Sequence, residues 1–175
     1  SMRVFAEEFN TGTIETLMTK PITAFNIVLA KYLAVLSLIL ISIIPTIIYV
    51  VSIYFLGEII GNLDLASIVG SYIGLILLSS IFSTISVYAS SLSSNQIVAF
   101  ILAIIICSFF YFGIDLLSQV PLLLSVDLII QKIGISFHYN MLSKGLIKLS
   151  DFVYFISVSL LFIKLTEGVI KSRNS

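Results

Sequence analysis

Charged side chains are scarce in this chain. Only 10% of its 175 residues are Asp, Glu, Lys or Arg, whereas soluble domains carry about 25%. Hydrophobic residues make up 59% of the sequence, and the mean hydropathy is +1.18. A soluble fold of this size could not bury so much apolar surface. No charge occurs at residues 32–57 or 65–114. Since one crossing of a bilayer takes about 20 apolar residues, the composition predicts several membrane spans.

Net charge is also lacking, because nine basic residues balance nine acidic ones. This excludes the basic field that nucleic-acid binding requires, so we expect the lipid bilayer, and no nucleic acid, among the partners. The single cysteine, Cys107, excludes an internal disulfide framework, and its apolar surroundings favour a packing role. No apolar stretch precedes Ile27, a pattern unlike a cleavable signal peptide, so the first span should act as an internal insertion signal.

Motifs of catalysis are missing as well. The sequence contains no Walker-type phosphate loop, no HExxH, no GxSxG and no CxxC. Polar residues within the apolar stretches are Ser, Thr and Tyr, without the buried acid or base of a proton relay. His138 has no second histidine to complete a metal site, so we expect it to be structural or interfacial. We therefore expect no catalytic residue, and no cofactor or metal bound by this chain.

What is present is an all-α pattern of four spans, at about residues 24–56, 65–91, 97–117 and 151–170. Pro45 should kink the first span, and Lys31 near its start should extend into water. Asp151 is a candidate N-cap of the last span. Lys164 and Glu167, three residues apart, can pair near its end.

Two segments lie outside the spans. Residues 1–22 are polar enough to lie in water. We expect two short helices there, at residues 3–10 and 14–19. Gly12 should form the turn between them, and Thr13 should cap the second helix. Residues 118–150 place apolar side chains at helical spacing among charged ones, which predicts an outer amphipathic segment.

The second span carries two distinct faces. One is a serine stripe of four residues at helical spacing: Ser79, Ser83, Ser86 and Ser90. Gly70 and Gly74 form a GxxxG pair on nearly the opposite face, which favours close helix packing. The stripe is compatible with tight packing or with a polar lining for a substrate path.

Basic residues predict the orientation. Four spans place both ends on one side of the membrane, which then holds six of the nine basic residues: Arg3, Lys20, Lys31, Lys164, Lys171 and Arg173. By the positive-inside rule both ends are cytoplasmic. Ser94 should face the cytoplasm too, whereas Asn62 and residues 118–150 should face outward.

Two sequence patterns carry a family resemblance. The first combines Arg-Val-Phe-Ala-Glu-Glu at residues 3–8, Gly-Thr-Ile-Glu at 12–15, Thr-Lys-Pro-Ile at 19–22 and Ala-Lys-Tyr-Leu at 30–33. It closely resembles the cytoplasmic segment of ABC-2 type transporter permeases. The second, Phe-His-Tyr at 137–139, Lys-Gly at 144–145 and Ser-Asp-Phe-Val-Tyr-Phe at 150–155, is similar to the family's last outer segment and final span. Within the family, the Thr-Lys-Pro-Ile motif most resembles the corresponding sequence of the gliding-motility-associated permease subunit.

The resemblance implies a non-catalytic permease subunit in the bacterial cytoplasmic (inner) membrane, serving export or gliding motility. It implies a dimer with a second permease copy or a related permease-like subunit, and a separate ATPase subunit that binds ATP and Mg²⁺. The segment that docks on this ATPase would contain Glu7, Glu8, Gly12, Thr13, Glu15, Lys20 and Pro21. Family members have six spans, so the chain resembles a C-terminal fragment lacking the first two, or a reading frame begun late at Met2.

A membrane scaffold or anchor of a gliding or secretion apparatus is the alternative, since no feature of the sequence requires that a substrate passes. A neighbouring gene for an ATPase with a phosphate-binding loop would favour the transporter. Its absence would favour the scaffold.

Overall fold

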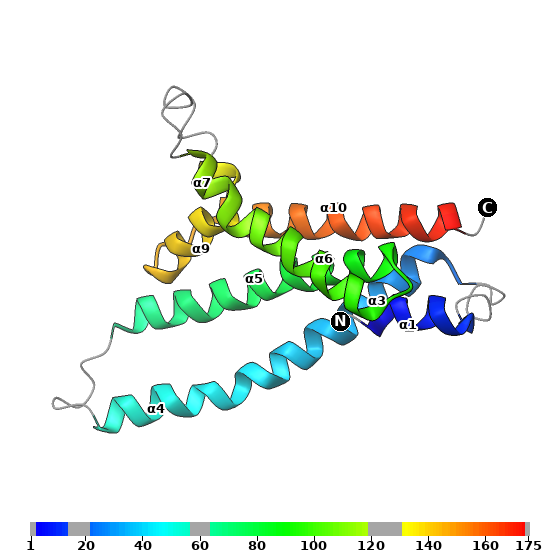
Figure 1. Cartoon of the computed structure of the whole chain (residues 1–175). Coiled ribbons are helices and arrows are strands. Elements are labelled where there is room, and N and C mark those ends of the chain that lie inside the picture. The colour runs from blue at the N-terminus through cyan, green and yellow to red at the C-terminus, as the bar shows by residue number, and fades with distance from the viewer. Residues whose placement is uncertain (1–2, 14–21, 57–63, 119–130, 174–175) are drawn as a thin grey trace.

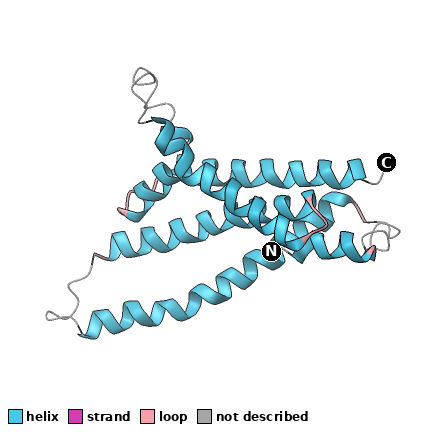
Figure 2. Ribbon diagram, in the orientation of Figure 1, coloured by secondary structure: helices cyan, strands magenta, loops and turns pink. Residues whose placement is uncertain are grey.

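The computed structural model describes residues 3–13, 22–56, 64–118 and 131–173. These residues form helices and short loops, with no strand among them (Figure 2). The elements are α1 (Arg3–Thr11), α3 (Ala24–Ile43), the 3₁₀ turn η1 (Ile44–Thr46), α4 (Ile47–Leu56), α5 (Leu65–Leu92), α6 (Gln96–Ser108), the π-helical turn η2 (Phe109–Gly113), α7 (Ile114–Ser118), α9 (Ile135–Ser143) and α10 (Leu149–Arg173). Asn62 and residues 119–130 of the predicted amphipathic segment lie outside the described residues.

Within the described residues, four helices are long and apolar enough to cross a membrane: Ala24–Leu56, Leu65–Leu92, Gln96–Leu117 and Leu149–Arg173. They confirm the four predicted spans and the all-α fold. Side-chain caps explain where three of them begin. Thr23 Oγ1 accepts a hydrogen bond from Asn26 N at 3.3 Å, and Asn95 Oδ1 accepts one from Ile97 N at 2.9 Å.

Asp64 caps α5 in the same way. Its Oδ1 accepts hydrogen bonds from Ala66 N at 3.1 Å and Ser67 N at 3.3 Å, and its Oδ2 accepts one from the Ser67 hydroxyl at 2.5 Å. The hydrogen bond from the Ser67 side chain is the main reason that the pKa of Asp64 lies below its usual value. A carboxylate at this position also suits the positive end of the helix dipole.

The last span begins earlier than predicted. Helix α10 starts at Leu149, so Asp151 lies in its first turn, and its carboxylate bonds to His138 instead of capping the helix. The N-cap prediction for Asp151 is therefore wrong. A histidine thirteen residues away competes successfully for the carboxylate, which the local sequence around Asp151 does not indicate.

Pro45 interrupts the first span as predicted. The α-helix ends at Ile43, three residues form a 3₁₀ turn, and a new α-helix begins at Ile47, because proline lacks the N–H of a regular helical turn. An apolar groove of about 450 Å³ lies between α3–α4 and α5. Thr46 Oγ1 and the Tyr72 hydroxyl meet across this region at 3.1 Å.

Helix α5 is the central element, and it packs against α1, α3, α6, α9 and α10. One buried cluster includes Phe5, Val28 and Ile170 and lies where α3 begins and α10 ends. The other includes Ile135 and Leu142 of α9 and lies toward the opposite end. In Figure 1, α1 and the end of α10 accordingly share one end of the bundle, while α9 and the start of α10 share the other.

Candidate coupling interface

Helix α1 packs against α5 and α6 along one of its faces. Phe5 and Ala6 are fully buried there, and Phe5 joins Val28 of α3 in one apolar cluster. The expectation that residues 1–22 lie in water is therefore wrong for this face. The sequence does carry a signal for it, because Phe5 and Phe9 are four residues apart and share one side of a helix.

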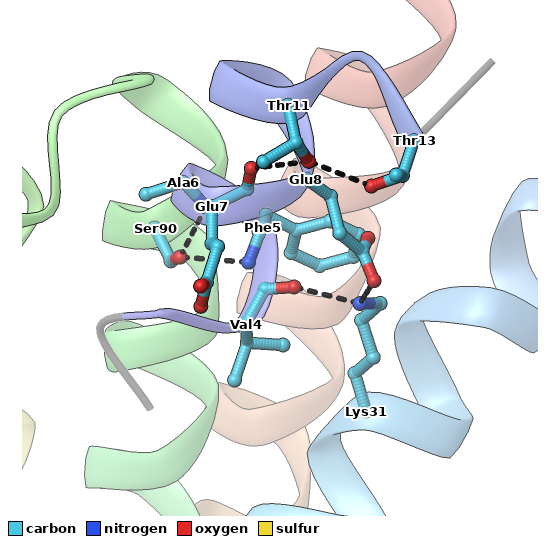
Figure 3. Close-up of polar contacts among 9 residues, drawn as sticks. All are labelled: Val4, Phe5, Ala6, Glu7, Glu8, Thr11, Thr13, Lys31 and Ser90. Atoms are coloured by element: carbon cyan, nitrogen blue, oxygen red, sulfur yellow. Dashed lines mark hydrogen bonds and ion pairs between the residues drawn. The ribbon is translucent and has the colours of Figure 1, made fainter.

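Ser90 of α5 binds the beginning of α1. The first four N–H groups of a helix have no partner within it and need one elsewhere. Ser90 Oγ accepts hydrogen bonds from Phe5 N at 2.9 Å and Ala6 N at 3.0 Å, and Figure 3 shows its hydroxyl facing these two amides. A buried serine of the second span thus acts as a capping group for another helix.

Lys31 of α3 holds the same helix from a second side. Its ammonium group donates to the Val4 carbonyl oxygen at 2.6 Å, pairs with Glu8 Oε1, and lies 4.7 Å from the centre of the Phe5 ring. Figure 3 shows the side chain reaching from α3 to α1. The expectation that Lys31 extends into water is therefore wrong, because a carboxylate and a helix carbonyl are nearer partners for its charge.

The opposite side of α1 is polar and exposed. Glu7 and the residues from Thr11 to Thr13 are exposed, and Thr11 Oγ1 donates to the Glu7 carbonyl at 2.9 Å. Gly12 has a φ of +71°, which confirms the predicted turn and suits glycine. Three further predicted coupling residues lie outside the described residues: Glu15, Lys20 and Pro21.

The end of α10 also contacts α1. Arg173 donates to the Leu92 carbonyl oxygen at 2.6 Å, and its guanidinium lies 4.5 Å from the centre of the Phe9 ring. The predicted ion pair between Lys164 and Glu167 is confirmed at 2.8 Å. Sequence reasoning missed the role of Arg173, because its partners are far away along the chain.

The serine stripe has several roles. Ser83 and Ser90 are buried. Ser90 is the stripe residue that accepts hydrogen bonds from α1 in the described part of the chain. Ser79 and Ser83 donate back to carbonyl oxygens of their own helix, at Leu75 and at Ser79, both at 2.6 Å. A polar lining formed by the stripe stays a prediction.

Gly70 and Gly74 lie where α5 meets α9. A Cβ at Gly70 would lie 2.1 Å from the Leu142 carbonyl oxygen and 3.0 Å from Gly145 Cα. A Cβ at Gly74 would lie 3.2 Å from the Tyr139 ring. The close neighbour of the glycine face is thus α9 of the same chain. Gly145, which follows α9, has a φ of +75°.

Among the described residues, no three His, Cys, Asp or Glu side chains lie close enough together to hold a metal ion. No curated protein and no solved structure matches the chain. Residues 1–174 match the model of the family described as ABC-2 family transporter protein. The match covers nearly the whole chain and agrees with the resemblance seen at residues 3–33. The chain therefore belongs to the ABC-2 transporter family, whose members are membrane components of transporters and are not themselves catalytic.

Proposed function

We propose that this chain is the permease subunit of an ABC transporter and that α1 couples it to a separate ATPase subunit, which binds ATP and Mg²⁺. The permease works as a dimer, with a second copy or a related permease-like subunit. It lies in the bacterial cytoplasmic membrane with both ends in the cytoplasm. The sequence likeness at residues 19–22 supports a role in gliding motility, with export as the broader alternative.

The observation that carries the proposal is the two-sided construction of α1. Its exposed side presents Glu7 and the turn at Gly12, while its buried side is bonded to Ser90 of α5 and Lys31 of α3. A partner that moves α1 from the exposed side must therefore move the first two spans as well. Such a rigid connection is what a two-state coupling between ATPase closure and rearrangement of the spans requires.

Glu7 and Glu8 are neighbours in the sequence, but their carboxylates have different surroundings in the structure. Glu8 pairs with Lys31 inside the permease, so its replacement would disturb the docking of α1 itself. Glu7 is exposed and is the appropriate residue for testing contact with a partner. Gly12 has no atom within 4 Å of an added Cβ, so a β-branched residue there would strain only the turn.

The test reconstitutes the permease in nanodiscs with the ABC ATPase subunit proposed as its partner. Glu7→Lys and Gly12→Val should each lower ATPase capture and the associated ATP turnover by at least about fivefold, because an interface anchor of this kind is worth more than about 1 kcal/mol. The insertion and dimerisation of the permease should not change. Lys144→Glu, a charge reversal of the same size at an exposed residue beyond α9, is the matched control and should behave as wild type.

Unchanged capture and turnover in both variants would remove α1 from the coupling mechanism. That result would favour a scaffold or anchor that carries no substrate. The two changes shift the net charge in opposite directions, so an equal loss in Lys144→Glu and Glu7→Lys would show a general disturbance of the permease and would remove the support for the α1 surface.

A further inference from the structure

His138 and Asp151 form a buried polar pair at the outer end of the molecule. Their relative exposures are 8% and 3%, and His138 Nδ1 lies 2.7 Å from Asp151 Oδ1. The second ring nitrogen, Nε2, lies 2.9 Å from the Lys132 carbonyl oxygen. Both ring nitrogens of one histidine therefore face oxygen atoms.

The chemistry of these contacts requires a proton between the two side chains. A carbonyl oxygen can only accept, so Nε2 must carry the hydrogen of its bond to Lys132. The contact between Nδ1 and Oδ1 then needs a second hydrogen, held either by the imidazole or by the carboxyl group. Without it, the lone pair of Nδ1 would face a carboxylate oxygen in a buried site, which is repulsive.

The pair joins α9 to α10, two helices that follow one another in the chain. His138 lies on α9 and Asp151 in the first turn of α10. The His138 ring also stacks on Tyr154 of α10, with centroids 4.0 Å apart and planes at 22°. Tyr154 in turn donates its hydroxyl hydrogen to the Ile133 carbonyl oxygen at 2.5 Å. Two hydrogen bonds and one ring stack thus hold α9, and the residue Ile133 just before it, against α10.

The other side of α9 rests on α5 mainly through apolar packing, with one hydrogen bond of 3.4 Å from the Ser71 hydroxyl to the Ser143 carbonyl oxygen. Leu142 lies over Gly70 and Gly74, and Ile135 and Leu142 are fully buried. The His138–Asp151 pair fixes the position of α9 relative to α10.

We propose that the His138–Asp151 pair is a proton-bearing latch that holds the outer helix α9 against the last span. The latch is closed while the hydrogen bond between the two side chains is made. Loss of either partner leaves the other as a buried polar group without its bond, which costs more than the bond itself contributes, and α9 then separates from α10. This inference does not depend on the ATPase partner.

The test measures the exposure of α9 with single cysteines in a Cys107→Ser background. Ser136→Cys is nearly isosteric at a buried position of α9, and Asn140→Cys is its exposed control on the same helix. With the protein in nanodiscs and a water-soluble maleimide, Asn140→Cys should react readily and Ser136→Cys slowly. Adding Asp151→Leu or His138→Phe should raise the Ser136→Cys rate, relative to Asn140→Cys, by at least about fivefold.

A combined variant keeps the test informative if a single change unfolds the protein. His138→Phe with Asp151→Leu removes both polar groups and should lower the relative rate below that of either single variant, because an apolar pair leaves no unpaired buried group. The latch is refuted if the single variants label as wild type does. It is also refuted if the two single effects simply add in the combined variant, because the two residues would then act independently.

Discussion

Ser90 and Ser79 lie on one helical stripe, yet their hydroxyl groups have different partners. Ser90 Oγ accepts from two amides of α1, whereas Ser79 Oγ donates to Leu75 of its own helix. A hydroxyl that bonds back to its own helix adds little to stability. One that satisfies two free amides at a helix start resembles an N-cap, which is worth about 0.5–2 kcal/mol.

The first residue-scale prediction follows from this difference. Ser90→Ala should raise the hydrogen-exchange rate of the first-turn amides of α1 by about 5- to 30-fold, the range that 1–2 kcal/mol corresponds to. Ser79→Ala is the matched control and should leave those rates unchanged. Hydrogen exchange with mass spectrometry on the permease in detergent measures both. Equal protection of α1 in the two variants would mean that Ser90 does not hold the helix.

Sequence reasoning at this scale succeeded where the interaction is local. The turn at Gly12 depends on that residue and its immediate neighbours, and Lys164 and Glu167 are three residues apart. The local sequence was therefore sufficient to predict both features. It failed for Lys31 and Asp151, whose partners lie 23 and 13 residues away. A lone basic residue in an apolar stretch indicates that a counter-charge exists, but only the fold identifies it.

At the scale of elements, the close approach between α5 and α9 depends on two glycines. The backbone of α9 occupies the space that a side chain at Gly70 would need, since the added Cβ would lie 2.1 Å from a carbonyl oxygen. At Gly74 the nearest atom belongs to the Tyr139 ring, which can shift. Gly168 of α10, by contrast, has nothing within 4 Å of an added Cβ.

These three sites predict an order of effects for glycine-to-alanine variants. Gly70→Ala should lower the apparent melting temperature most, because backbone must move, and Gly74→Ala should lower it less. Gly168→Ala should be neutral or stabilising by up to about 1 kcal/mol, since alanine is the better helix former. Thermal unfolding in one detergent, followed by circular dichroism, gives the three values. If Gly70→Ala melts at or above wild type, the described contact with α9 is not formed in solution.

The spans themselves were predictable because hydropathy is a property of consecutive residues. All four follow from runs of apolar side chains, and Pro45 itself indicates where the first span is interrupted. The π-helical turn at Phe109–Gly113 was not foreseen, nor was the buried face of α1, which depends on what α3, α5 and α6 present to it. The contact at Gly70 and Gly74 was predictable only in part. The spacing of the two glycines indicates a close helix neighbour, but it does not indicate that this neighbour is α9.

At the scale of the whole molecule, α5 connects the two ends of the bundle. It bonds to α1 through Ser90 near one end and supports α9 through Gly70 and Gly74 near the other. Movement imposed on α1 therefore has a continuous packed route to α9 within this chain. The same arrangement requires that α1 and α9 lie on opposite sides of the membrane, which makes the orientation testable.

The topology prediction uses two exposed residues at the two ends of the bundle. Ser94 lies in the loop between α5 and α6, near α1, and Lys144 follows α9. In a Cys107→Ser background, Lys144→Cys should react with a membrane-impermeant maleimide in intact cells, and Ser94→Cys should react only in inverted membrane vesicles. The basis is the excess of basic residues on the side of α1 and the end of α10, which the positive-inside rule assigns to the cytoplasm.

A membrane-permeant maleimide should label both cysteines in either preparation, which controls for the reactivity of each thiol. Labelling of Ser94→Cys in intact cells together with protection of Lys144→Cys would reverse the orientation. In that case α1 would face away from the cytoplasm, out of reach of a cytoplasmic ATPase, and the coupling proposal would fail with it. Labelling of both residues from the same side would instead contradict the crossing of the membrane by the helices between them.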